Sequence, residues 1–99
     1  MVVQSIKEFE WDQVNIEHIA QRYVKPEEAE QVFFDVNHVL GEDIKHSATE
    51  KRLLIIGKTK KGRLLYQIFT VRGDKIRVIS SRDINKKEVE LYEKKTGSS

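Results

Sequence analysis

Residues 53–81 read LLIIGKTKKGRLLYQIFTVRGDKIRVISS, and this stretch decides the fold. Three segments within it, 53–59, 64–71 and 75–81, are rich in the branched and aromatic residues typical of strands. Lys60-Lys61-Gly62 separates the first two segments, and Arg72-Gly73-Asp74 separates the last two. Short turns that contain glycine join antiparallel neighbours. The stretch therefore predicts three consecutive antiparallel strands, a meander.

The flanking sequence predicts three helices. Asp12 suits the N-cap of a helix that ends near Tyr23, because apolar residues follow it at helical spacing. Pro26 suits the first turn of a second helix. Asn85 followed by Glu88 has the pattern of a capping box and predicts a third helix that ends at residue 93 or 94.

Two further segments complete the predicted sheet. Residues 2–10 predict a strand, and Val39 with Leu40 predicts the start of a short one before a loop over 42–50. The chain is therefore expected to adopt the α+β class, as one domain over residues 1–99. We expect a twisted antiparallel sheet of four to five strands with helices packed on one face.

Composition bounds the class of protein. The 99 residues suffice for one core, and the 38% hydrophobic content predicts a folded chain and not a disordered one. The absence of cysteine excludes a disulfide, a thiolate nucleophile and a cysteine-based zinc site. Residues 1–6 lack the pattern of a signal peptide, and no apolar run approaches the roughly 20 residues that span a bilayer. We expect a soluble, cytoplasmic protein.

Charge is unevenly distributed along the chain. Residues 1–50 hold 4 Lys or Arg against 11 Asp or Glu, whereas residues 51–99 hold 14 against 5. This asymmetry predicts one acidic and one basic face if each half keeps to its own side of the fold. A basic face attracts the phosphates of a nucleic acid, although charge runs are more often simply solvated surface.

Several motifs recur in an order that resembles the BrnT family. They are Phe9-Glu10-Trp11-Asp12, Pro26-Glu27-Glu28-Ala29, the glycine-containing hairpin, Arg77-Val78-Ile79-Ser80-Ser81-Arg82, and a Lys-Lys-Glu helix that ends in Tyr92. The resemblance spans roughly residues 9–94. It implies a toxin of a type II toxin-antitoxin pair with a compact RelE-like fold. Such toxins cleave RNA unless a cognate antitoxin binds them, and that antitoxin is commonly a ribbon-helix-helix DNA-binding protein.

The chain departs from this family at the end of the first helix. Family members often carry Lys-His-Gly or Arg-His-Gly there, whereas this chain reads Gln21-Arg22-Tyr23. Arg22 therefore replaces a histidine, and a titratable group is lost. Tyr23 replaces the glycine that permits a left-handed helix end, so we expect the turn to be built another way. If the missing histidine contributes to catalysis, the protein is slower or inactive.

Arginines supply the first candidates for a catalytic site. Metal-independent cleavage of RNA needs cationic donors for the developing phosphate charge, and a guanidinium binds phosphate oxygens bidentately. Arg63, Arg77 and Arg82 are the candidate phosphate clamps. Alternation along a strand places Ser80 and Arg82 on one face and Arg77 on the other. The resemblance favours Ser80 and Arg82 as a site pair, and the alternative is a surface serine beside a helix-capping arginine.

Histidines are the candidate proton carriers. The resemblance favours His46 as an acid or base, and the alternative is a loop histidine without a role. His18 is expected to be a packing or surface residue, although it lies near the end of the first helix, where the chain differs from the family. His38 carries no signal. Positions 18, 38 and 46 lack the paired helical spacing of a metal site, so we expect neither metal nor cofactor.

Cations around the two turns are the candidate RNA contacts. We expect the two hairpin tips to straddle an RNA backbone. Tyr66 could stack on a base, whereas Trp11 and Phe69 are expected in the core. The tip residues are Lys58, Lys60, Lys61, Arg72 and Lys75.

The leading hypothesis is a metal-independent endoribonuclease toxin that cleaves RNA by 2′-OH attack with stabilisation by arginine. Its partners would be RNA and a cognate antitoxin, with which it could form an oligomer. The alternative is a catalytically inactive homologue that acts as an RNA-binding or antitoxin-binding module, and Arg22 is its main support. A third hypothesis is a subunit that docks its acidic half onto a basic protein.

Overall fold

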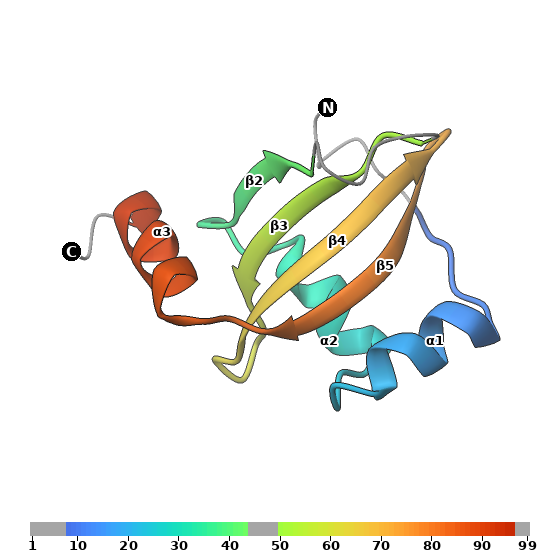
Figure 1. The fold of residues 1–99 in the computed structure, drawn as a ribbon, viewed down its shortest axis with the longest axis horizontal. Helices are drawn as coiled ribbons and strands as arrows, with labels where there is room; N and C mark the ends of the chain where they lie inside the picture. Colours follow the sequence, from blue (N-terminus) through green and yellow to red (C-terminus); the bar gives the residue numbers. More distant parts are fainter. Residues whose placement is uncertain (1–7, 44–49, 97–99) are drawn as a thin grey trace.

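The computed structural model describes residues 8–43 and 50–96 as three helices and five strands (Figure 1). The meander predicted from residues 53–81 is confirmed, as is the short strand at Val39. The elements are β1 (Glu8–Phe9), α1 (Gln13–Ala20), α2 (Pro26–Val32), β2 (Val39–Glu42), β3 (Leu53–Lys58), β4 (Leu64–Arg72), β5 (Lys75–Asp83) and α3 (Lys86–Thr96).

All five strands belong to one sheet with the order β1-β5-β4-β3-β2. The pairs from β2 to β5 are antiparallel, whereas β1 runs parallel to β5. The α+β class is thus confirmed, but the sheet is mixed rather than purely antiparallel. The parallel pairing arises because β1 aligns with the start of β5 in the same direction, with Phe9 opposite Ile76. After β1 the chain continues into α1.

The main core lies between the sheet and the helices α1 and α2. Phe33 at the end of α2 contacts Phe69 of β4 edge to face, with ring centroids 4.9 Å apart. Phe69 and Ile19 of α1 are fully buried, as expected for apolar faces that meet across two layers. Gly57 of β3 allows close approach, because an added Cβ would lie 2.8 Å from the backbone oxygen of Val32.

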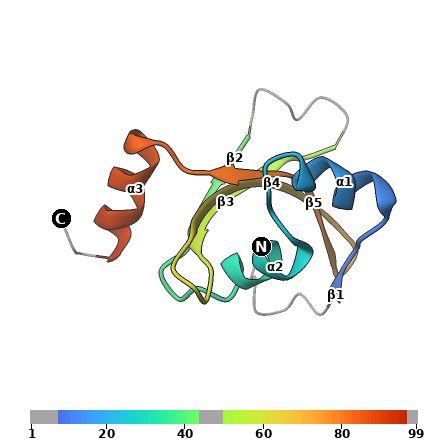
Figure 2. The ribbon, with the colours of Figure 1, turned by 90° about the horizontal axis from the view of Figure 1, so that it is seen from below.

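The third helix lies against the opposite face of the sheet, so the prediction that all helices share one face is wrong. Lys58 follows Gly57 and therefore points away from α2. Its ammonium lies 5.8 Å from the centroid of the Tyr92 ring in α3. The Tyr92 hydroxyl donates to Asp35 at 2.6 Å and so ties α3 to the end of α2. Figure 2 shows α2 beneath the curved strands and α3 outside them at the left.

The helix starts predicted from the sequence are confirmed. Asp12 caps α1 by accepting from the amide of Asn15 at 3.1 Å. Asn85 and Glu88 form the predicted capping box, with both backbone-to-side-chain hydrogen bonds present. No helix within the described ranges 8–43 and 50–96 is both long enough and apolar enough to cross a membrane.

Tyr23 closes α1 in the left-handed conformation, with φ of 60°. The amide of Tyr23 donates to the carbonyl of Ala20, and that of Val24 donates to Ile19. These two bonds define a Schellman motif, and Ile19 and Val24 are both buried as its hydrophobic contact requires. The expectation of a different turn is wrong, because tyrosine adopts the conformation that usually belongs to glycine.

Ion pairs join the acidic first half of the chain to the basic second half. Cations of residues 51–99 pair with carboxylates of residues 1–50 at several places in the sheet and helices. These cations of the second half therefore lie beside carboxylates of the first half and not on a separate basic face. The pairs are Lys51–Glu42, Arg63–Glu28, Arg72–Glu10, Arg72–Glu50, Lys75–Glu8 and Arg77–Asp12.

Candidate functional site

A pocket of about 250 Å³ lies where the C-terminal end of α1 meets β4 and β5. Ser80 and Arg82, which the resemblance predicts as a site pair and alternation places on one face, both line it. The structure adds His18 and Arg22 from the end of α1, and Tyr66 from β4. Gln21 and Ser81 complete the lining. The pocket therefore combines cationic, hydroxyl and imidazole groups, with no carboxylate among its lining residues.

A bulge in β5 sets the direction of the side chains in this pocket. Ile68 pairs with Ser80 but the next residue, Phe69, pairs with Val78, so Ile79 has no partner opposite it. One strand thus carries an extra residue, as in a β-bulge. Ser81 beyond the bulge is buried and donates to Gln67 at 2.7 Å. Ser80 and Arg82 lie on the opposite side of the strand from Ser81.

Arg82 is held rigidly by two elements. Its Nη1 and Nη2 donate to the two carboxylate oxygens of Glu88 at 2.9 and 2.8 Å, and Nη1 also donates to the carbonyl of Asp83. The guanidinium lies 4.2 Å from the centroid of the Tyr66 ring, a cation–π contact. The hydrogen bonds that Arg82 donates to Glu88 raise the pKa of Arg82. Arg82 therefore remains cationic and fixed.

One edge of the Arg82 guanidinium remains available. A guanidinium has five N–H groups, and Glu88 and Asp83 take three of them. Within the described chain no hydrogen bond engages Nε or the second hydrogen of Nη2. These two groups form a second bidentate edge that matches a phosphate. The Arg82 side chain is 39% exposed, and Arg82 lines the pocket.

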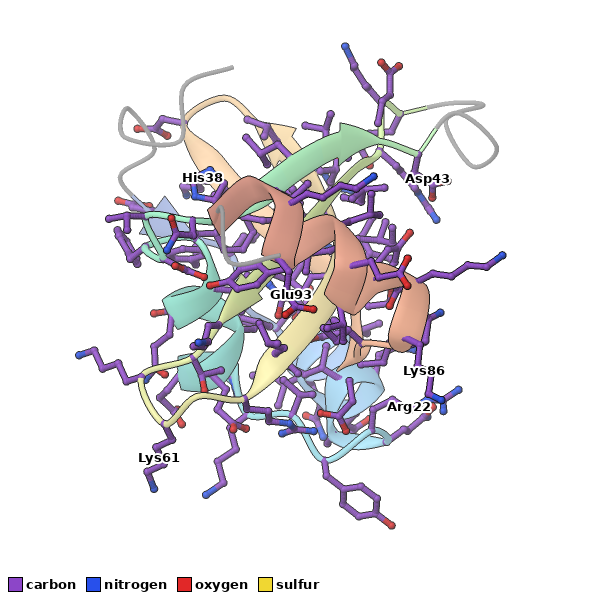
Figure 3. The ribbon with its side chains drawn as sticks, turned by 90° about the vertical axis from the view of Figure 1, so that its left-hand side faces the viewer. Arg22, His38, Asp43, Lys61, Lys86 and Glu93 are labelled. Atoms are coloured by element: carbon purple, nitrogen blue, oxygen red, sulfur yellow. The ribbon has the colours of Figure 1, made fainter. Side chains whose placement is uncertain are left out.

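His18 and Arg22 reach the pocket from one side of α1. They are four residues apart, and residues at this spacing are neighbours on a helix. Both are exposed, and Arg22 lies in the turn after α1, where its amide donates to the carbonyl of Ile19 three residues earlier. The Arg22 side chain has no hydrogen bond or ion pair with any other residue in the described ranges, and Figure 3 shows it extending outward. Arg22 is thus a cation with its donors unoccupied.

Arg63 has a different environment from Arg82. Its Nε and Nη2 donate to Asp83, and its remaining hydrogens go to Glu28 and to the carbonyls of Arg22 and Tyr23. The hydrogen bond to Asp83 raises the pKa of Arg63. All five N–H groups are engaged, so none remains for a phosphate. Arg63 fixes the turn after α1, and we leave it out of the proposed site.

Arg77 is also engaged, at the other end of α1. It donates to both oxygens of the N-cap residue Asp12, at 2.8 and 3.3 Å. This hydrogen bond lowers the pKa of Asp12. The eight residues of α1, about 12 Å of helix, separate this pair from the pocket, and Arg77 is not among the pocket's lining residues. Arg77 and Arg82 are therefore too far apart to hold one phosphate.

The two turns of the meander lie at opposite ends of β4 (Figure 1). The nine residues of β4 span about 30 Å, so the two tips cannot contact the same phosphate, and their contact with one RNA backbone stays a prediction. Arg72 and Lys75 flank the turn between β4 and β5, and both pair with carboxylates of the first half of the chain. Lys60 and Lys61 at the turn between β3 and β4, here called the near turn, are exposed, and Figure 3 shows Lys61 pointing outward.

Two groups in the pocket, His18 and Arg22, were not among the site residues predicted from the sequence. His18 was expected to pack or to lie on the surface, and Arg22 was noted only as a replaced histidine. Their spacing of four residues on one helix was the signal that could have paired them. Tyr66 was a candidate for stacking, and its ring stacks on Arg82. His46 lies outside the described residues.

A larger hollow of about 600 Å³ lies between α2 and the β3–β4 hairpin. Its charged lining residues are Glu27, Glu30, Asp35, Lys58 and Lys60. Glu30 accepts from the Trp11 indole, and Asp35 accepts from Tyr92, so two of these carboxylates serve the fold. This hollow contains no histidine or arginine, so we place the candidate site in the smaller pocket.

The chain matches a known protein family over most of its length. Residues 11–88 match the family described as the ribonuclease toxin BrnT of the type II toxin-antitoxin system. The chain belongs to the BrnT family. The matched segment includes every residue that lines the 250 Å³ pocket. BrnT membership implies a ribonuclease toxin and a cognate antitoxin as its partner. A search of curated proteins found no match.

Proposed function

We propose that this BrnT protein is a metal-independent endoribonuclease that cleaves single-stranded RNA in the pocket between α1, β4 and β5. Arg82 and Ser80 hold the scissile phosphate, and Arg22 neutralises charge beside it. The RNA 2′-oxygen attacks the adjacent phosphorus, and the bond to the 5′-oxygen breaks. The products are a 2′,3′-cyclic phosphate and a 5′-hydroxyl.

One observation carries this proposal: the available bidentate edge of Arg82 beside Ser80. Glu88 and Tyr66 fix the guanidinium before a ligand arrives, so little side-chain ordering is needed on binding. Donors fixed in advance stabilise charge that develops in a transition state. Ser80 is half-buried in the same pocket and adds a hydroxyl donor.

The chemistry of the lining residues supports cleavage without a metal. Mg²⁺ prefers oxygen ligands, carboxylates above all. The lining instead supplies cations and neutral groups, which bind the phosphate directly.

RNA beyond the scissile phosphate would follow the exposed lysines of the near turn. Lys60 and Lys61 lie at this turn, and Arg63 beside them anchors the turn after α1 to β5. The family resemblance further supports a ribbon-helix-helix antitoxin, which forms an oligomer with this protein. His46 remains a candidate acid or base on the strength of that resemblance.

A catalytically inactive homologue is the second candidate function. Arg22 in place of the family's histidine favours it, because this position loses a group that can transfer protons. Such a protein would bind RNA or its antitoxin without turnover. Expression without the antitoxin separates the two candidates: the enzyme arrests growth, whereas the inactive homologue does not.

Cleavage of labelled single-stranded RNA by purified variants tests the proposal. Arg82→Ala removes the phosphate clamp, and Lys87→Ala removes one exposed positive charge from α3 as a matched control. We expect Arg82→Ala to lower kcat by about 10²- to 10³-fold, and Lys87→Ala to leave it unchanged. Equal activity of all three proteins would contradict the proposed site.

A further inference from the structure

We propose that His18 is the general base of this site and accepts the proton of the attacking 2′-OH. This inference rests on the proposed ribonuclease function. It assigns to His18 the proton transfer that Arg22, which stands where the family has histidine, cannot perform.

Elimination among the pocket-lining residues points to His18. The two arginines keep their protons in proteins, and glutamine has no titratable group. The serines are weak bases, and Ser81 already donates to Gln67. Burial raises the pKa of Tyr66, so its phenol stays protonated. Histidine is the side chain that gives and takes protons near neutral pH, and His18 alone provides it in this lining.

The fold fixes His18 relative to the phosphate clamp. The side-chain amide of Asn15, one turn earlier in α1, donates to the carbonyl of Val78 at 3.3 Å and to that of Glu10 at 2.9 Å. Val78 lies two residues before Ser80 on the strand that carries both Ser80 and Arg82. Ile19, the residue after His18, is fully buried. Helix α1 is therefore locked to β5, and His18 keeps its place beside the pocket.

Arg22 and His18 then have complementary roles. The neutral imidazole takes the 2′ proton while the new bond between the 2′-oxygen and phosphorus forms. Arg22 and Arg82 stabilise the charge that develops on the phosphate oxygens. The departing 5′-oxygen takes its proton from water, and the imidazolium later releases the 2′ proton to solvent. Each proton is thus accounted for without a metal.

Chemical rescue provides the decisive test. In His18→Ala we expect RNA cleavage to fall by about 10²- to 10⁴-fold, the usual contribution of a general base, with the Kd for RNA unchanged. Added imidazole should restore part of the lost rate, because it can occupy the vacated space and take the proton. His38→Ala is the matched control, and we expect it to cleave RNA normally with no response to imidazole.

The outcomes separate this inference from the proposed function. If the parent cleaves and Arg82→Ala does not, but His18→Ala cleaves normally, the inference is wrong and the site stands. Loss in His18→Ala without imidazole rescue also overturns it, because a structural role would explain the loss. A parent that does not cleave overturns both.

A modified substrate tests the direction of proton transfer. Sulfur in place of the 5′-oxygen leaves without protonation, so it rescues the loss of a general acid but not of a general base. We expect no rescue of His18→Ala by this substrate. Full rescue would show that His18 protonates the leaving group and would overturn its assignment as the base.

Discussion

Replacing Tyr23 with glycine should stabilise this protein, although it removes an aromatic side chain. Tyr23 has φ of 60°, and 87% of the residue is exposed. A side chain in this region costs about 1 to 2 kcal/mol, whereas glycine costs about 0.5 to 1 kcal/mol in lost backbone freedom on folding. The exposed ring contributes little packing in return. The net gain in free energy of unfolding is therefore between about 0 and 1.5 kcal/mol, and its midpoint of about 0.75 kcal/mol corresponds to roughly 3 to 6 °C in Tm.

Urea denaturation of Tyr23→Gly and Tyr23→Ala isolates the backbone effect. Both variants remove the ring, but only glycine removes the Cβ that opposes a positive φ. We expect Tyr23→Gly to unfold at higher urea than the parent and Tyr23→Ala to unfold at or below the parent's midpoint. Equal midpoints for the two variants, or a loss of stability in Tyr23→Gly, would refute the argument from strain.

Three further predictions concern the contacts that hold the pocket in place. Gly57→Ala should lower the free energy of unfolding measured in urea by about 1 to 3 kcal/mol, because the new Cβ meets the backbone of Val32. Gly41→Ala should lower it less, because its Cβ meets only the flexible Leu54 side chain. A larger loss in Gly41→Ala than in Gly57→Ala would contradict this prediction. Arg63→Lys keeps the charge but should destabilise the fold by about 2 kcal/mol, since one ammonium cannot replace a guanidinium bonded to two carboxylates and two carbonyls. An unchanged midpoint of urea unfolding would contradict this role of Arg63. The hydrogen bond from Arg63 lowers the pKa of Asp83, so its stabilisation is present above the unfolded pKa near 4 and is lost as pH falls through the lowered folded pKa. Stability should therefore fall below about pH 4, and Asp83→Asn should weaken this dependence; an unaltered pH profile would contradict it.

Local sequence signals predicted most of the elements. Asp12, Asn85 and the glycines of the two turns each act within a few residues, so their effects can be read along the chain. They located the helix starts and the meander. The face that α3 covers was not predictable in this way, because it depends on the contact of Tyr92 with Asp35, which is 57 residues away.

The site was predicted only in part, for the same physical reason. Ser80 and Arg82 share a pocket as the alternation indicated. The sequence could not show that hydrogen bonds within the fold engage all five N–H groups of Arg63. Nor could it show that the end of α1 places His18 beside β5. Arginine in a basic segment predicts affinity for phosphate, but only the positions of distant carboxylates decide which guanidinium keeps free donors.

Cleavage in EDTA of an RNA with a single 2′-deoxy nucleotide at the cleavage position shows whether the 2′-OH is the nucleophile and whether a metal is needed. We expect the purified protein to cut the all-ribose RNA in EDTA, to leave 2′,3′-cyclic phosphate and 5′-hydroxyl ends, and to spare the substituted position. Cleavage that persists at the 2′-deoxy nucleotide, or that appears only with a divalent metal, would contradict attack by the 2′-OH in an arginine-lined pocket.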